Sequence, residues 1–490
     1  MKRWIAGFLA ALLLLSALPL AGAAFSDDAK INANYKQAVN EMAEKKVISG
    51  FEDGSFRPSE TLTRAQAAKI LCVLLEGAEK ADALTKTETG FADVPASHWA
   101  AKYVAYCADK GIVAGVGAGK FDPDGKLSYA AFAKMLLVAC GEDGAQFTGA
   151  EWTKAVKTAA PNALLDYKIE EFSERTLPRQ QAAQMAWNAN FTREANEAAT
   201  KDMESRPYPT ATSIPKSLKI ISIGSSFSNN CILGYTYEML KDVGVEDLTL
   251  ACSYASGASL TTYVDGFKSG DEKFTYYKRH EGKWKTSKKW SLEKELADED
   301  WDIISFMQTP AKKYQPMKNQ LMYYVQKTHP NANFVWNVIW AHSNRSKQSA
   351  FVKTWNGDQL GMYNGMVKLA RENVEPDPRI RAIIPVGTAI QNARTSFIGD
   401  NLDRDTYHLN KSIGYYIASM MWTCKLLGVT PDQIKYVPED GLLANPPHGF
   451  DKDTPGLSEA LVAVAKESVA NALANPYEVT PSKLTEAPKK

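Results

Sequence analysis

One pattern occurs twice in the amino-terminal third of the chain, and this internal repeat limits the possible folds more than any other feature of the sequence. Residues 39–75 and residues 103–138 both predict a helix that ends at a glycine, a tight loop with a Phe-x-Pro motif, and a second helix. The motif reads FRP at residues 56–58 and FDP at residues 121–123. Its phenylalanine anchors the loop in the core, and its proline prevents the first helix from continuing. The repeat therefore predicts a helical unit.

A third and more divergent copy extends from about residue 152 to residue 195, where TLPRQQAA at 176–183 matches TLTRAQAA at 61–68. The sequence FEDGSFRPSETLTRAQAA of the first copy resembles the signature of the S-layer homology repeat, and the resemblance covers about residues 30–195. Repeats of this family occur in threes on bacterial surface proteins. The resemblance implies a three-pronged helical bundle that holds secondary cell-wall polysaccharide without a covalent bond, with repeats at about 30–80, 90–145 and 150–195.

The same resemblance suggests which side chains hold the polysaccharide. Arg64 would face an anionic sugar group, and Arg179 would do the same in the third repeat. The planar guanidinium suits a fixed carboxylate because it donates two parallel hydrogen bonds. In the second repeat, residues 128–131 (SYAA) replace the Thr-Arg stretch, so we expect no binding there. The alternative is a spacer that kept the fold and lost the ligand.

The first residues of the chain predict export. Lys2 and Arg3 precede an apolar run at residues 4–20, and small residues are present at 21–24. This order is typical of a secretory signal peptide at residues 1–24, cleaved after Ala23 or Ala24. The alternative is an uncleaved anchor, but the run is slightly short for a membrane span of about 20 residues. We therefore expect the mature chain, from about residue 25 onward, on the cell surface or cell wall of a bacterium, with no membrane attachment after cleavage.

Composition excludes several kinds of partner. The 57 basic and 56 acidic side chains leave a net charge of +1, which argues against a nucleic-acid-binding protein. The densest basic run, residues 273–289, interleaves lysines with aromatic residues and predicts a hairpin. The six cysteines show no C-x-x-C spacing and no nearby histidine, so we expect neither a metal site nor a cofactor. The sequence leaves one or two disulfides open.

The rest of the chain predicts an α/β domain. Residues 196–217 are polar and contain three prolines, which is typical of a linker. Residues 218–475 then alternate apolar strands with helices, and this pattern predicts a parallel sheet covered on both faces, a three-layer α/β/α fold. The tail at 476–490 is expected to be disordered. The expected strands are 218–223, 247–254, 301–308, 333–340 and 380–386, with helices at 232–243, 314–328, 358–374 and 410–427 and an inserted hairpin at 274–290.

Polar residues come directly after several of these strands, where ligands bind in sheets of this kind. They are GSSFS at residues 224–228, SGAS at 256–259, Gln308 after the third strand, and DTYH at 405–408 before the last helix. Each motif alone is common by chance, because serine beside glycine often only caps a helix. Together and in this order, over about residues 218–428, they resemble the SGNH (GDSL-like) hydrolase superfamily, which has a flavodoxin-like fold. A more specific likeness is to an uncharacterised bacterial branch that also carries GTAIQNARTS, here residues 387–396.

The resemblance implies a Ser-His-Asp mechanism. It assigns the nucleophile to Ser226, the general base to His408 and the orienting carboxylate to Asp405. The oxyanion would accept hydrogen bonds from the backbone of Ser226 and Gly257 and from the side chain of Gln308. The family normally has Gly-x-Asn-Asp at the third position, so Gln308 is the main departure from its pattern.

Several further residues have competing interpretations. Asn392 and Arg394 would orient a substrate, or else belong to a helix surface that braces the sheet edge. His342, which comes after the fourth strand, is an alternative base. The hairpin aromatics could form a platform for a sugar, although we favour cross-strand packing; they are Tyr276, Tyr277, Trp284 and Trp290.

These observations favour a wall-attached serine esterase that removes acetyl or similar groups from a carbohydrate. Its partners would be secondary cell-wall polysaccharide and a carbohydrate ester. The alternative is a surface or carbohydrate-binding protein whose hydrolase-like domain has lost catalysis, and Gln308 is the residue that keeps this alternative open.

Overall fold

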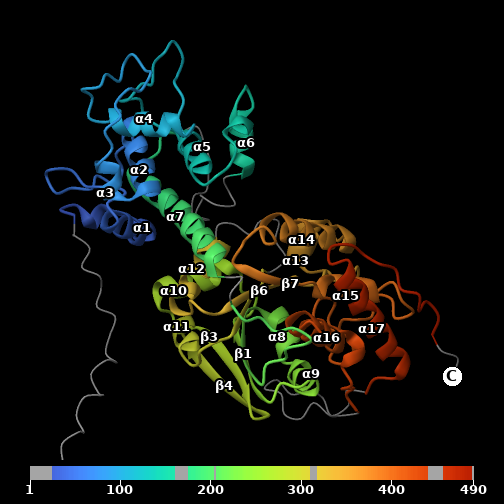
Figure 1. The fold of residues 1–490 in the computed structure, drawn as a ribbon. Helices are drawn as coiled ribbons and strands as arrows, with labels where there is room; N and C mark the ends of the chain where they lie inside the picture. Colours follow the sequence, from blue (N-terminus) through green and yellow to red (C-terminus); the bar gives the residue numbers. More distant parts are fainter. Residues whose placement is uncertain (1–24, 160–174, 203–205, 309–316, 440–455, 488–490) are drawn as a thin grey trace, which may run out of the picture. The chain divides into compact units, whose positions relative to one another are not determined.

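A computed structural model describes residues 25–159, 175–202, 206–308, 317–439 and 456–487. The chain divides into two compact units, Met1–Asn190 and Phe191–Lys490, which are described separately (Figure 1). The boundary falls inside helix α7 (Arg179–Asp202), so the first part of the predicted linker is helical. Residues 179–202 are rich in alanine, glutamate and glutamine and lack proline, and these residues favour continuation of a helix. The predicted signal peptide lies outside the described residues.

The first unit consists of helix pairs, as the repeat predicts. In the first two copies, a loop with its Phe-x-Pro motif separates the paired helices, and Phe56 and Phe121 are fully buried. Thr63 caps the second helix of the first copy by accepting a hydrogen bond from the backbone of Gln66. The helices are α1 (Ala33–Glu44), α2 (Arg64–Glu76), α3 (Ala78–Asp82), α4 (Ala101–Asp109), α5 (Tyr129–Ala139), α6 (Trp152–Ala159) and the start of α7.

A ring of backbone hydrogen bonds joins the three copies at their centre. The N–H of Leu62 donates to the carbonyl of Leu177 (2.9 Å), that of Leu177 to Leu127 (2.8 Å), and that of Leu127 to Leu62 (2.9 Å). Each leucine comes from a different copy and precedes its second helix by the same distance in sequence. Because the ring closes, the divergent third copy occupies a full position in the bundle.

The second unit is built on one seven-stranded sheet with the order β4-β3-β2-β1-β5-β6-β7. Five strands are parallel, and the hairpin β3–β4 adds two antiparallel strands beyond β2. Glu281 and Gly282 both have positive φ, as the two-residue turn of a twisted hairpin requires. The mixed α/β fold is thus confirmed. The strands are β1 (Ser217–Gly224), β2 (Asp247–Tyr254), β3 (Phe274–His280), β4 (Lys283–Trp290), β5 (Ile303–Phe306), β6 (Asn333–Asn337) and β7 (Ile380–Ile384).

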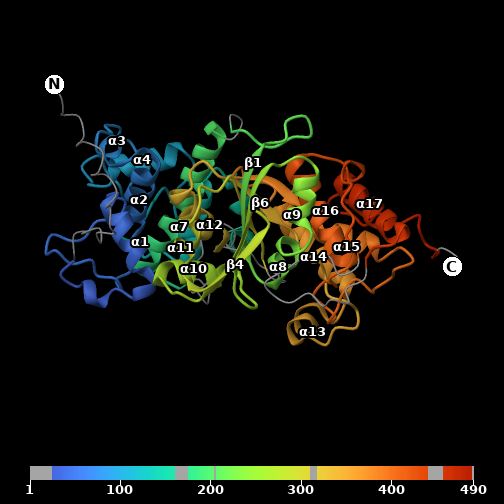
Figure 2. The ribbon, with the colours of Figure 1, turned by 90° about the horizontal axis from the view of Figure 1, so that it is seen from below.

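Helices cover both faces of this sheet. One layer contains α8 (Ser226–Ile232), α9 (Thr236–Asp242) and α16 (Ile413–Leu427). The other layer contains α10 (Leu260–Ser269), α11 (Leu292–Leu296) and α12 (Met317–Thr328). In both views, α15 (Val386–Ala393), α16 and α17 (Glu459–Ala474) lie side by side (Figures 1 and 2). The remaining helices of the unit are α13 (Ser349–Trp355) and α14 (Gln359–Asn373).

The carboxyl-terminal tail corrects one expectation. Composition predicts disorder for residues 476–487 because they are polar and contain proline, but they lie against α15 and α17. The backbone of Thr480 donates to the side chain of Asn392 (2.8 Å), and that of Ser482 donates to Thr395 Oγ1 (2.7 Å). The N–H of Phe397 donates in turn to the carbonyl of Leu484 (2.9 Å). Backbone groups of the tail thus bind short polar side chains and backbone groups of α15 and of the residues after it, and these contacts hold the tail in place.

Two further properties concern the described part of the chain as a whole. None of its helices combines the length and apolar character needed to cross a bilayer. All six cysteines lie within it as free thiols, so they form no disulfide.

Candidate active site

The strand order defines where a ligand would bind. The parallel strands follow the flavodoxin-like order, in which the chain turns to opposite sides of the sheet after β1 and after β2. Ligands bind at the carboxyl ends of the two central strands that flank this reversal, here β1 and β5. Ser226 begins the helix after β1, and Gln308 comes two residues after β5. Both predicted site residues therefore lie at the expected edge.

The turn between β1 and α8 exposes Ser226. A side chain at Gly224 would meet Ser228 Oγ at 2.0 Å and Met307 Cγ at 2.6 Å, so this position requires glycine. Ser225 caps α8 by accepting a hydrogen bond from the N–H of Phe227 (3.4 Å). Ser225 and Phe227 are buried whereas Ser226 is half-exposed. The fold thus directs the hydroxyl of Ser226 outward at the sheet edge.

A continuous chain of hydrogen bonds joins three predicted residues. The Ser226 Oγ lies 2.7 Å from Nε2 of His408, and Nδ1 of His408 lies 2.7 Å from Oδ2 of Asp405. Asp405 Oδ1 also accepts the backbone N–H of His408 at 2.8 Å. This contact from Nδ1 favours the tautomer that leaves Nε2 free to accept the serine proton.

The electrostatics of the site suit a base. Burial lowers the pKa of His408 below 6.5, although Asp405 opposes this shift. Burial raises the pKa of Asp405, but the hydrogen bonds from His408 outweigh it and hold that pKa below 3.8. At neutral pH the imidazole is therefore neutral and the carboxylate is charged, as general-base catalysis requires.

The loop that carries His408 is strained and tightly held. Thr406 has φ of 74°, which is unfavourable for a β-branched residue. Its N–H donates to Asp403 Oδ1 (2.7 Å), and its carbonyl accepts the N–H of Ser343 (2.8 Å). The indole of Trp340 donates to the carbonyl of Tyr407 (2.7 Å). These contacts compensate for the strained turn, which brings the Asp405 carboxylate back onto His408.

Asn230 is a residue that the sequence analysis missed. Its side-chain amide donates to the carbonyl of Ser226 (2.8 Å) and its oxygen accepts the N–H of Leu409 (3.0 Å). Because Asn230 is 2% exposed, this pair of bonds is shielded from water. Asn230 therefore ties the serine helix to the loop of His408. The available signal was a polar side chain four residues after Ser226, one helical turn away.

The two further oxyanion candidates lie on neighbouring loops. Gly257 has φ of 63° in the exposed turn between β2 and α10, where a side chain would be strained. Gln308 accepts the N–H of Leu260, the first residue of α10, through its Oε1 (3.1 Å). This bond ties Gln308 to the start of α10, which follows the loop of Gly257, and does not use its NH₂ group.

Asn392 and Arg394 are buried and bonded within the protein, which favours the bracing role over contact with a substrate. Asn392 is fully buried; it donates to the carbonyl of Ser468 (3.2 Å) and accepts a bond from the tail. Arg394 donates to the carbonyl of Ala341 (2.9 Å) and forms an ion pair with Asp400 (3.0 Å). Their polar atoms hold α15, α17 and the adjacent loops together.

His342 is not the base in this arrangement. It is 7% exposed and lies among the rings of Phe227, Phe351 and Tyr407. Burial lowers its pKa to about 4, so it is neutral and a poor proton acceptor. Its place near His408 makes it part of the wall beside the triad.

In the first unit, the two predicted arginines bind backbone carbonyls of another copy. Arg64 donates to Phe121 (2.7 Å) and Ala114 (2.7 Å), and Arg179 donates to Phe56 (2.9 Å) and Ser49 (2.6 Å). Arg179 is 4% exposed. It is therefore closed to a ligand in this structure, which corrects the expectation for the third repeat. Arg64 is partly exposed.

Comparison with known proteins places both units. Residues 24–68 and 90–133 match the S-layer homology domain, and residues 219–442 match a domain of unknown function, DUF4886. The Surface-layer 125 kDa protein of Lysinibacillus sphaericus is 34% identical over 144 residues, which are 29% of this chain and 12% of that protein. An uncharacterized cell wall amidase of Bacillus anthracis is 35% identical over 104 residues, which are 21% of this chain and 18% of that protein.

A crystal structure of a DUF4886 family protein from Bacteroides uniformis aligns with 55% of this chain and all of its own, with 27% identity and a TM-score of 0.47. The chain spans less than a fifth of the length of the curated relatives it matches. These matches define a protein of the cell surface or cell wall with S-layer homology domains at its amino-terminal end. Its carboxyl-terminal unit carries a DUF4886 domain.

Proposed function

We propose that the second unit is a serine esterase of the SGNH type, and that its substrate is an acyl ester on a carbohydrate. The observation that carries this proposal is the hydrogen-bond chain from Ser226 through His408 to Asp405, at the reversal point of the sheet. A neutral histidine 2.7 Å from a half-exposed serine hydroxyl, itself bonded to a carboxylate, is the arrangement that activates a serine nucleophile.

The reaction begins when His408 Nε2 removes the proton of Ser226 as Oγ attacks the ester carbonyl. The backbone N–H groups of Ser226 and Gly257 and the amide of Gln308 would donate to the oxyanion. His408 then returns the proton to the leaving alcohol, and the acyl group stays on Ser226. A water molecule, deprotonated by His408, attacks this ester and restores the serine.

The substrate class is inferred from location. A protein at the cell wall meets acylated carbohydrate polymers, and by resemblance the S-layer homology unit would hold secondary cell-wall polysaccharide and so keep the chain at the wall. Arg64, which is partly exposed, is the arginine that we propose to contact that polymer. The name of one relative, a cell wall amidase, makes an amide the competing substrate to include in any assay.

The test uses the full chain with p-nitrophenyl acetate and with a fluorophosphonate that labels activated serines. We expect hydrolysis and labelling at Ser226, both abolished in Ser226→Ala and strongly reduced in His408→Ala. His98→Ala, in the first unit, is the matched control and should behave as wild type. Labelling at another serine, or equal rates in all variants, would refute the proposal and favour a binding protein without catalysis.

A further inference from the structure

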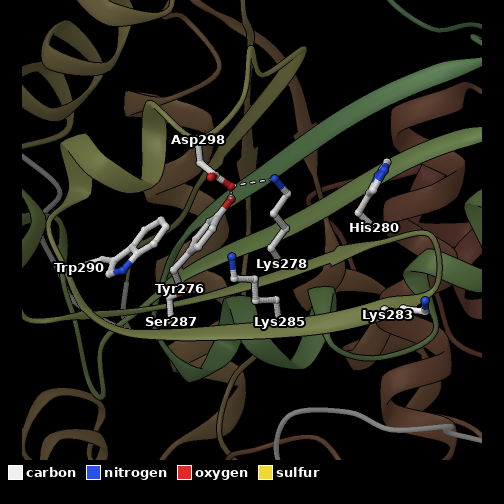
Figure 3. Close-up of a pocket in the computed structure, with 8 residues that line it drawn as sticks. All are labelled: Tyr276, Lys278, His280, Lys283, Lys285, Ser287, Trp290 and Asp298. Atoms are coloured by element: carbon white, nitrogen blue, oxygen red, sulfur yellow. Dashed lines mark hydrogen bonds and ion pairs between the residues drawn. The ribbon is translucent and has the colours of Figure 1, made fainter.

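The hairpin at the edge of the sheet forms a hollow of about 220 Å³ (Figure 3). It lies on the opposite side of β2 from β1, and the triad residues do not line it. Its lining combines basic, aromatic and hydroxyl groups, and the residues are Tyr276, Lys278, His280, Lys283, Lys285, Ser287, Trp290 and Asp298.

The strand register explains why these side chains share one face. Side chains alternate between the two faces of a strand, so residues 276, 278 and 280 of β3 project together. Their partners on β4 are Ser287, Lys285 and Lys283, respectively, and project to the same side. Lys288, which follows Ser287 on β4, pairs with Thr275 and projects to the other face.

This face places like charges directly opposite each other. Lys278 faces Lys285, and such a pair destabilises a sheet unless the charges are compensated. Lys278 is compensated, because its ammonium contacts the carboxylates of Asp298 (2.8 Å) and Glu299. Figure 3 shows that Asp298 contacts both Lys278 and Tyr276. The hydroxyl of Tyr276 donates a hydrogen bond to the Asp298 carboxylate at 3.0 Å.

Lys283 and Lys285 are not compensated in this way. Both are exposed, and neither forms an ion pair with a described residue. The hollow therefore contains two positive charges in excess of its own carboxylate, and the backbone positions of Lys283 and Lys285 are about 7 Å apart along the strand. Two neighbouring cations on one face fit a chain that repeats negative groups.

The aromatic end of the hollow suits a sugar ring. Trp290 stacks on Tyr276, with ring centroids 5.2 Å apart and planes 14° apart. Trp290 remains half-exposed, and the ammonium of Lys294 also lies over its ring, 4.7 Å from the centroid. The accessible part of this pair therefore combines aromatic edges with a further cation beside the lysines. An aromatic surface with adjacent hydrogen-bonding groups binds partners that have both apolar and polar faces.

Lysines on an edge strand can also serve only to prevent pairing with other strands. That role needs charge anywhere along the edge, and Lys288 and Lys289 already supply it. It does not require a second pair of lysines on the same face as a hollow and an aromatic pair. We propose that this hollow binds an anionic segment of a carbohydrate polymer, with its carboxylate or phosphate groups on Lys283 and Lys285 and a sugar ring against Trp290. Binding of this kind does not depend on catalysis by Ser226.

The experiment measures binding of the full chain, carrying Ser226→Ala, to three probes by calorimetry. Oligogalacturonate carries both sugar and carboxylate, its methyl ester carries the sugar alone, and short-chain polyphosphate carries the charge alone. We expect oligogalacturonate to bind at least about tenfold more tightly than its ester, as the loss of charge-assisted bonds implies.

The matched variants are Lys285→Glu and Lys288→Glu, which change net charge equally on opposite faces of β4. We expect Lys285→Glu to lower the affinity for oligogalacturonate by about tenfold or more, and Lys288→Glu to lower it by less than about twofold. The two variants should have equal melting temperatures. Trp290→Ala should weaken the binding of oligogalacturonate and leave the binding of polyphosphate unchanged. Since all variants retain the first unit, differences between them report the hairpin alone.

Three outcomes would overturn the proposal. An equal loss in both lysine variants would mean nonspecific attraction, and equal binding of the ester would remove the role of the anionic groups. Polyphosphate could also bind as tightly as oligogalacturonate, with no effect of Trp290→Ala on either probe. This result would show an anion site that does not recognise carbohydrate. None of these outcomes bears on the esterase, which the serine label tests separately.

Discussion

A buried carboxyl group in the second unit makes its stability depend on pH in a defined window. Glu295 lies on α11 with no solvent exposure, and no described residue lies within normal hydrogen-bond geometry of its carboxylate oxygens. Burial raises its pKa from 4.5 to about 8, and the nearby Ser253 hydroxyl offsets this only in part. The group is therefore protonated and neutral in the folded protein at neutral pH.

The sign of the effect depends on proton binding in the two states. Between pH 4.5 and 8 the folded state holds a proton on Glu295 that the unfolded state has released, so the free energy of unfolding falls as pH rises. Each pH unit across this interval costs about 1.4 kcal/mol, which sets an upper limit of about 5 kcal/mol in total. Below pH 4.5 both states are protonated and the contribution no longer changes with pH.

The perturbation is Glu295→Gln, which keeps the shape and removes the ionisation. Other buried groups contribute equally to wild type and variant and cancel in the comparison. The pKa of His342 is lowered from 6.5 to about 4, which makes stability rise with pH below about 6.5 in both proteins, and burial raises the pKa values of Cys252 and Tyr263 well above 9 and 10. Calorimetric melting of the full chain at pH 5 to 9 should show that the variant's second-unit transition loses less stability with pH than that of wild type. Glu272→Gln, on an exposed residue, should match wild type. Parallel pH profiles for wild type and Glu295→Gln would refute the reasoning.

Three further predictions concern the triad and the repeats. Asp405→Asn should lower kcat by about 10⁴-fold because the tautomer of His408 is no longer fixed. For the wild-type protein, kcat/KM should fall only below pH 6.5, since the pKa of His408 is lowered. A pH profile of kcat/KM that already falls with decreasing pH above pH 7 would contradict this. Asn230→Ala should lower kcat by about 10- to 100-fold with little change in KM, because the hydrogen bonds that join the serine helix to the histidine loop are lost. Unchanged ester hydrolysis would show that other contacts are sufficient to position these residues. Arg179→Ala should lower the free energy of unfolding of the first unit by about 2–4 kcal/mol, because two carbonyls lose a charged donor. Urea denaturation combined with hydrogen exchange in that unit measures this free energy. A loss below about 0.5 kcal/mol would mean that water replaces the guanidinium.

The sheet and the triad neighbourhood were predictable because they depend on local patterns. Apolar strands separated by helices imply a parallel sheet, and the carboxyl ends of its strands meet at one edge. Ser226 and Gln308 each come after a strand, so their approach required only the correct strand order. His408 required more, since it belongs to a loop whose position depends on Trp340 and Asp403, but the short spacing to Asp405 identified that loop.

The residues that sequence analysis misjudged depend on long-range contacts. Asn392 and Arg394 lie on a helix that carries polar side chains, and nothing in that pattern shows that the tail and α17 cover them. The tail has the composition of a disordered segment, although the backbone of Thr480 binds Asn392 on α15 and that of Ser482 binds Thr395 just after this helix. Asn230 was passed over for the same reason, because its second partner, Leu409, is distant in sequence.

The arginines of the first unit show how two motifs of the repeat depend on each other. Arg64 of the first copy holds the Phe-x-Pro loop of the second, and Arg179 of the third holds that of the first. In the second copy, the residue at the position of Arg64 and Arg179 is Tyr129. In the third copy, Glu171-Phe172-Ser173 stands where the others have Phe-x-Pro. The second copy thus has no arginine at this position, and the third has no Phe-x-Pro at the matching place in its sequence. A guanidinium that binds the backbone carbonyls of a neighbouring Phe-x-Pro loop accounts for the pairing of the two motifs in the first and third copies.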